Sequence, residues 1–128
     1  MIQLGIDESR RLYLIAGKAF AGDKGTTATV ALPTMFGGLA LSGFDTGYIY
    51  IKYGDTYEAI ELAALSGTVD IEPADAVFAE AGTIKIWAEF SDTGGDLLQK
   101  SSVLSYIIET SETYTAPEAS QETEPGTE

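Results

Sequence analysis

The feature that most constrains the fold of this chain is the alternation of apolar and polar residues in Thr-Ile-Lys-Ile-Trp-Ala-Glu-Phe, at positions 83–90. Successive side chains of a β-strand point to opposite faces, so this pattern predicts a half-buried strand. Its two faces carry Ile84, Ile86, Ala88 and Phe90 on one side and Lys85, Trp87 and Glu89 on the other. Residues 91–96 are all turn formers, and a second apolar run covers 97–108. Together these segments predict an antiparallel hairpin.

Further short segments rich in β-branched and aromatic residues lie between turn signals, at 11–16, 26–32, 48–53, 56–62 and 68–71. The first two are separated by a Gly-Asp-Lys-Gly turn and are predicted to pair with each other. Residues 33–47 are too rich in glycine for a helix, and we expect them to cross between two sheets with Leu39 or Leu41 in the core. One short helical turn is expected near 73–79. The pattern predicts an all-β antiparallel sandwich of about seven to eight strands.

The chain has 128 residues, which is a usual size for one domain. Its composition changes after Glu109, because residues 110–128 are rich in threonine, serine and glutamate and contain no basic residue. A segment of this kind cannot bury enough apolar surface to fold alone. We therefore expect a β-sandwich domain at 1–109 and a flexible, disordered acidic tail or linker at 110–128.

The sequence contains neither cysteine nor histidine. Catalysis by Ser-His-Asp or Cys-His groups and zinc-dependent hydrolysis are thereby excluded. Residues 17–24 have the glycine spacing of a phosphate-binding loop, but Asp23 stands where that loop requires lysine. The acidic segments 70–72 and 92–96 lack the alternating ligands of a calcium loop, and a domain of this size leaves little room for a glycosidase cleft around Glu58 and Glu61. The sequence predicts no catalytic residue, no metal ligand and no cofactor, and we expect a protein that is not an enzyme.

Acidic residues outnumber basic ones by 20 to 7, which gives a formal net charge of −13. Nucleic acids and anionic membranes attract proteins through lysine and arginine, so neither is an expected partner. No apolar run approaches the roughly 20 residues that cross a bilayer, and the N-terminus lacks the basic flank and apolar core of a signal peptide. We expect a soluble protein made in the cytoplasm.

Two groups of residues are candidates for contacts with a partner. The connection at 35–41, Met-Phe-Gly-Gly-Leu-Ala-Leu, is too apolar to be left exposed, so it either enters the core or is covered by another chain. Its candidate residues are Met35, Phe36, Leu39 and Leu41. The second group is Tyr48, Tyr50 and Trp87, which share strand faces with charged residues. These aromatic side chains either fill the second side of a sheet or form a patch that stacks on a sugar or anchors a protein.

The order of these features resembles a known family. The Gly-Asp-Lys-Gly turn, the run Asp-Ile-Glu-Pro at 70–73, the strand Ala-Gly-Thr-Ile-Lys-Ile-Trp at 81–87, Asp92 in a glycine-rich turn and the last strand at 101–108 are similar to the N-terminal immunoglobulin-like domain of phage baseplate upper proteins. The resemblance spans roughly residues 10–109. It implies an immunoglobulin-like sandwich with a structural role in a virion.

From this resemblance we expect a non-enzymatic component of the phage virion, associated with the baseplate, the tail or the capsid. The implied partners are other virion proteins and further copies of the chain in a homo-oligomer, and the implied location is the virion after synthesis in the host cytoplasm. The alternative is a β-sandwich that binds carbohydrate, such as a host cell-surface glycan, through Trp87 and the tyrosines.

Overall fold

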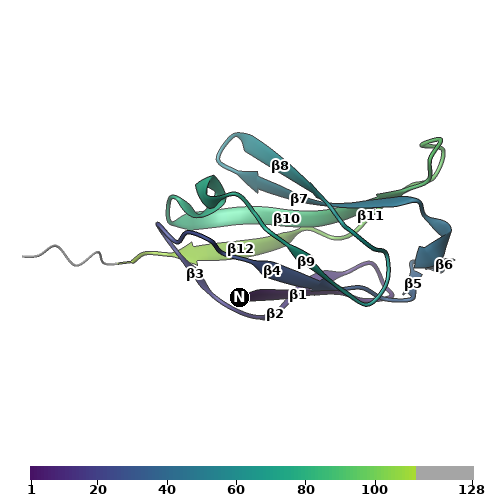
Figure 1. The fold of residues 1–128 in the computed structure, drawn as a ribbon, viewed down its shortest axis with the longest axis horizontal. Coiled ribbons are helices and arrows are strands. Elements are labelled where there is room, and N and C mark those ends of the chain that lie inside the picture. Colours follow the sequence, from purple (N-terminus) through teal and green to yellow (C-terminus); the bar gives the residue numbers. More distant parts are fainter. Residues whose placement is uncertain (112–128) are drawn as a thin grey trace, which may run out of the picture.

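The computed structural model describes residues 1–111. Two β-sheets stacked face to face form the main part of this region (Figure 1). The smaller sheet has the strand order β2 (Leu12–Ala16), β1 (Ile2–Ile6), β4 (Ala28–Ala31) and β9 (Thr68–Ile71). The larger sheet has the order β3 (Ala19–Phe20), β12 (Leu104–Glu109), β10 (Gly82–Ser91), β7 (Thr46–Tyr53) and β8 (Thr56–Glu61). In addition, β11 (Leu98–Lys100) pairs with β10. The predicted all-β sandwich is confirmed.

The strand order is that of an immunoglobulin-like sandwich. The chain enters the larger sheet briefly at β3 and returns to the smaller sheet at β4. It then crosses to the larger sheet between β4 and β7, returns between β8 and β9, and crosses again between β9 and β10. As a result β4 lies beside β9 in one sheet, while β12, β10 and β7 are neighbours in the other, which is the arrangement of the central strands of immunoglobulin domains. Eight strands have four or more residues, and four are shorter. The predicted second strand of the hairpin, at 97–108, is divided into β11 and β12, while β1, β3, β5 and β6 were not among the segments expected from the sequence.

The pairing within the smaller sheet differs from the prediction. The runs at 11–16 and 26–32 form β2 and β4, but they do not pair with each other, because β1 lies between them. This first strand is antiparallel to β2 and parallel to β4, and its alternate residues Ile2, Leu4 and Ile6 are buried. A second parallel pair joins β3 to β12. The expectation of a purely antiparallel sandwich is therefore wrong at these two pairs.

The core lies between the sheets and contains the predicted inward face of β10, namely Ile84, Ile86, Ala88 and Phe90. Ile49 and Ile51 of β7 face the same way, which decides between the two faces that the sequence left open for this strand. Phe90 meets the ring of Phe36 with 4.9 Å between centroids in an edge-to-face arrangement. Burial of each large apolar side chain contributes about 1.5–3 kcal/mol, so these residues account for much of the stability of the fold.

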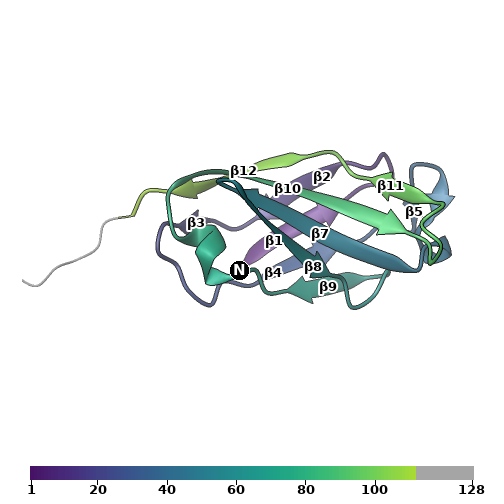
Figure 2. The ribbon, with the colours of Figure 1, turned by 90° about the horizontal axis from the view of Figure 1, so that it is seen from above.

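Different structural elements cover the two ends of the sandwich (Figure 2). At one end, the expected crossing at 33–47 forms a small hairpin of β5 (Met35–Phe36) and β6 (Leu39–Ala40), followed by a short 3-10 helix, η1 (Leu41–Gly43). At the other end lies η2 (Asp75–Phe78), the expected helical turn, which buries Val77 and Phe78. Within residues 1–111 the structure has no helix long and apolar enough to cross a membrane.

Candidate functional site

A cluster of aromatic side chains covers the outer face of the larger sheet. This aromatic surface consists of Tyr48, Tyr50, Tyr57 and Trp87, which come from the three neighbouring strands β7, β8 and β10. Trp87 and Tyr50 are direct partners in the register of β10 and β7, and Tyr57 is the partner of Lys52 between β8 and β7. The period-2 alternation that buries Ile86 and Ile49 thus turns these rings to the outside.

The rings of the aromatic surface contact one another. Trp87 is stacked on Tyr50 with 5.6 Å between centroids and 12° between ring planes. Tyr57 approaches Trp87 edge-on at 6.3 Å, and Tyr48 lies 6.1 Å from Tyr50. Contacts of this kind contribute about 0.5–1.5 kcal/mol beyond the area that they bury. The cluster is therefore a set of rings held in fixed relation, with Trp87 half-buried and Tyr57 exposed.

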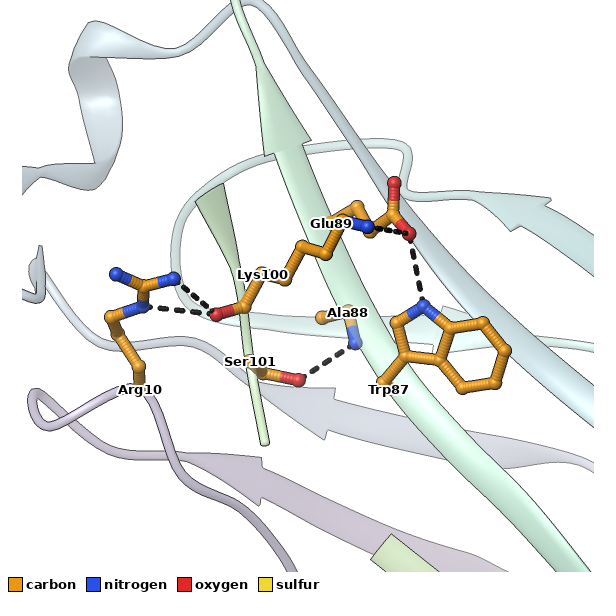
Figure 3. A network of polar contacts seen from close by, with 6 residues as sticks. All are labelled: Arg10, Trp87, Ala88, Glu89, Lys100 and Ser101. Carbon is orange, nitrogen blue, oxygen red and sulfur yellow. Dashed lines mark hydrogen bonds and ion pairs between the residues drawn. The ribbon is translucent and has the colours of Figure 1, made fainter. Parts of the chain in front are cut away.

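A polar network holds the indole ring in place (Figure 3). The Nε1–H of Trp87 donates a 3.0 Å hydrogen bond to Oε2 of Glu89, and Nζ of Lys100 lies 3.9 Å from the same oxygen. On the other side of β11, Arg10 donates from Nε and Nη2 to the carbonyl oxygen of Lys100, at 2.9 and 2.8 Å. The turn between β1 and β2 is thereby connected to β11. Lys100 of β11 orients Glu89, and Glu89 in turn holds Trp87.

Tyr50 remains protonated across the physiological pH range. Burial raises the pKa of its phenol above the usual value of 10.0, and the negative charge of Glu89 and the neighbouring Tyr48 raise it further. The neutral hydroxyl can both donate and accept a hydrogen bond. At the centre of the aromatic surface there is therefore a stable polar group beside the stacked rings.

Three of the seven basic residues of this acidic chain lie around the aromatic surface: Lys52, Lys85 and Lys100. Lys85 of β10 is the direct cross-strand partner of Lys52 of β7. The ammonium group of Lys52 also lies 5.8 Å from the centroid of the Tyr57 ring. The sequence placed both lysines on the same faces as the aromatic residues, but only the pairing of β7 with β10 brings the two lysines together.

A second surface lies at the open edge of the smaller sheet, along β2. The register of β1 and β2 shifts so that Leu4 pairs with Leu14 and Gln3 with Ala16, which leaves Ile15 as an extra residue. Leu14 and Ile15 are 41% and 51% exposed. A groove of about 410 Å³ runs beside them and is lined by residues 9–14 of the β1–β2 turn and β2 and by residues 102–105 at the start of β12. The exposed positions of Leu14 and Ile15 were not predictable from the sequence, because a bulge breaks the alternation of inward and outward side chains in β2.

The seven residues predicted to contact a partner fall into three places. Tyr48, Tyr50 and Trp87 come together on the aromatic surface. Met35 and Leu39 lie in the β5–β6 hairpin, where Met35 is the partner of Ala40 and Leu39 is the partner of Phe36, and they are 38% and 39% exposed. Phe36 and Leu41 are almost completely buried. They cannot serve as surface contacts, because the hairpin turns alternate side chains into the core. The connection at 35–41 was expected either to enter the core or to be covered by another chain. Phe36 and Leu41 enter the core.

Three of the carboxylates considered for chemistry accept hydrogen bonds from the backbone. Glu58 accepts a hydrogen bond from the backbone N–H of Ala74, and Asp92 accepts one from the N–H of Leu97. Asp23 accepts the N–H of Phe20. In residues 1–111, no group of three or more acidic side chains is arranged to hold a metal ion. The expected tail at 110–128 lies outside the described residues from position 112 onward.

The comparisons with known proteins add no relative. No protein-family model matches this sequence. A search of curated proteins likewise finds no match.

Proposed function

We propose that this protein is a non-enzymatic structural component of a phage virion, associated with the baseplate, the tail or the capsid, and that it acts through protein–protein contacts. The resemblance of residues 10–109 to the immunoglobulin-like domain of baseplate upper proteins supports this proposal, as does the immunoglobulin-like strand order. Immunoglobulin-like sandwiches serve many functions, so the support for this particular function must come from the contact surface.

The observation that carries the proposal is the open edge of β2. Its sequence, Leu-Tyr-Leu-Ile-Ala, contains no charged residue and no proline, although proteins usually protect an edge strand with such residues. The N–H of Leu12 is bonded to the Ser102 hydroxyl, and beyond Leu12 the bulge at Ile15 is the only such protection of the strand within residues 1–111. An apolar edge of this kind can add a strand from another chain through main-chain hydrogen bonds. The adjoining groove can accept the side chains of such a strand. Further copies of the chain and other virion proteins are the proposed partners at this edge.

Light scattering over a range of protein concentrations tests the edge. We expect the full chain to self-associate and Ile15→Lys to weaken that association by about tenfold or more, because a charge would be buried at the joined edge. Leu98→Lys, at a similarly exposed residue of β11, is the matched control and should associate like the wild type. Monomeric behaviour of the wild type at high concentration would count against self-association at the edge.

The virion location needs a separate test. Antibodies raised against the protein should label phage particles purified from a culture of the host, as seen by electron microscopy. Particles that contain no trace of the protein by mass spectrometry would contradict the proposal, whatever the result at the β2 edge.

Carbohydrate binding is the second candidate function, and the aromatic surface favours it. Stacked Trp and Tyr rings with a polar hydroxyl at their centre offer both apolar and hydrogen-bonding contacts to a sugar. The chain contains one tryptophan, so a change of its fluorescence on addition of a glycan would report on Trp87 alone.

A further inference from the structure

We infer that the aromatic surface binds an acidic saccharide, a sugar that carries a carboxylate or phosphate group, with Lys52 and Lys85 at the anionic group and Trp87 at the sugar ring. This inference rests on the second candidate function, carbohydrate binding. It adds the charge of the ligand and the residues that recognise that charge.

The two lysines face each other without an acidic partner. Like charges that face each other across two strands destabilise a sheet, and Lys52 and Lys85 are direct partners. Among residues 1–111, neither lysine has a carboxylate oxygen within 4.0 Å, although the chain has 20 acidic residues. An anion between the two ammonium groups would turn this repulsion into two charge-assisted contacts.

The order of side chains across the sheet places hydroxyl groups on both sides of the lysine pair. The register places Ser105, Lys85, Lys52 and Tyr57 in one row over the strands β12, β10, β7 and β8. Partners in such a row have Cβ atoms about 5 Å apart, so both lysines can reach one anionic group and the flanking hydroxyls can complete its hydrogen bonds. The next row holds Trp87 and Tyr50. It lies about 7 Å along the strands, close enough for one sugar unit to contact both rows.

The composition of the aromatic surface favours a small anionic sugar over a protein or a nucleic acid. Interfaces between proteins are enriched in arginine and depleted in lysine, whereas this face combines aromatic rings with lysines and the two arginines lie at Arg10 and Arg11 in and after the β1–β2 turn. A nucleic acid or other polyanion would be repelled by the net charge of −13. A single anionic group is affected mainly by charges within about 8 Å at physiological salt. The acidic residues Glu61 and Glu89 of this face lie two rows from the lysine pair, about 13 Å along the strands.

Fluorescence titration of Trp87 with pairs of sugars that differ in charge tests the inference. The probes are trigalacturonic acid against galactotriose, and glucose 6-phosphate against glucose, which separate the two sources of the anionic group. We expect at least one charged probe to shift the emission and to bind about tenfold or more tightly than its neutral counterpart. Lys52→Gln/Lys85→Gln should abolish that preference. Lys18→Gln/Lys24→Gln, with the same change of charge outside the aromatic surface, should retain it.

The outcomes distinguish this inference from carbohydrate binding in general. Equal binding of charged and neutral sugars would overturn the acidic class and leave carbohydrate binding in place, while no binding of any probe would overturn both. Equal losses in the two double variants would show non-specific attraction and would also overturn the inference. Lys85→Gln, at an exposed position, repeats the test if the double variant does not fold.

Discussion

Asp45 shows how one exposed side chain organises a loop of this fold. Its Oδ2 accepts two hydrogen bonds from Thr93, from the backbone N–H at 2.6 Å and from Oγ1–H at 2.8 Å. These bonds join the start of β7 to the turn after β10. The hydrogen bond from the Thr93 hydroxyl, followed by that from its backbone, lowers the pKa of Asp45 below the usual value of 3.8.

A pH dependence follows from this lowered pKa. A carboxylate with a lower pKa in the folded than in the unfolded state stabilises the fold above its unfolded pKa, and this contribution is lost as the pH falls through the folded value. Thr93→Val removes the hydroxyl donor, so we expect the pKa of Asp45 to rise toward its usual value. Carboxyl NMR titration measures this change. The lowered pKa of Asp7, which depends on Ser9 and Arg11, should not move.

Adjacent residues of β10 should differ greatly in their contribution to stability. Ile86 is buried between the sheets and Lys85 is exposed. Ile86→Ala should lower the free energy of unfolding by about 2–5 kcal/mol, because it removes buried methylene and methyl groups and leaves a cavity. Lys85→Ala should cost far less. Denaturant unfolding of both variants checks the difference, and equal small effects would mean that the strand is not half-buried.

At the scale of elements, Arg10 connects three segments that are distant in sequence. Besides its two hydrogen bonds to the Lys100 carbonyl, it donates from Nη1 to the side chain of Gln99, and its guanidinium lies 5.4 Å from the centroid of the Phe36 ring. Gly37 is required beside it, because a Cβ there would lie 2.5 Å from Cδ of Arg10. The β1–β2 turn, the β5–β6 hairpin and β11 are thus held together by one side chain.

Arg10→Lys should therefore destabilise the protein although it keeps the charge. A lysine ammonium cannot reproduce the fork of donors that reaches two groups at once. We expect a loss of about 1–3 kcal/mol in the free energy of unfolding, measured by denaturant titration. Arg11→Lys is the matched control, because Arg11 is exposed and lies over the Tyr13 ring. A similar loss in both variants would argue against the bridging role of Arg10.

Elements whose residues alternate strictly were predictable from the sequence. The alternation of β10 and β7 and the inward face of β10 follow from local periodicity. The outward position of Trp87 and Tyr50 does not, because periodicity separates the two faces of a strand without showing which of them another layer covers. Two further features were not predictable: the bulge that exposes Leu14 and Ile15, and the insertion of β1 between β2 and β4. Both depend on pairings between separate strands, which the pattern of a single segment does not encode.

At the scale of the whole molecule, charge and surface chemistry are distributed unevenly. The chain as a whole has a net charge of −13, yet three of its seven basic residues gather around the aromatic surface. The apolar exposed edge of β2 belongs to the other sheet. Composition predicted the acidity but not this local concentration of lysines, because the lysines come from three separate strands. The proposed assembly contacts and the proposed saccharide site therefore occupy different surfaces and can be tested independently.

The parallel pair of β3 and β12 has a consequence for biosynthesis. Ala19 pairs with Ile108, near the two ends of the described residues, so this edge of the larger sheet cannot close until almost all of residues 1–111 have left the ribosome. At about 5–20 residues per second, β3 is exposed for on the order of ten seconds before its partner strand is available. Early in that interval, before β7, β8 and β10 have been synthesised, the apolar faces of β1 and β4 have no opposing sheet. Newly made chains should then be most dependent on chaperones and most prone to aggregate.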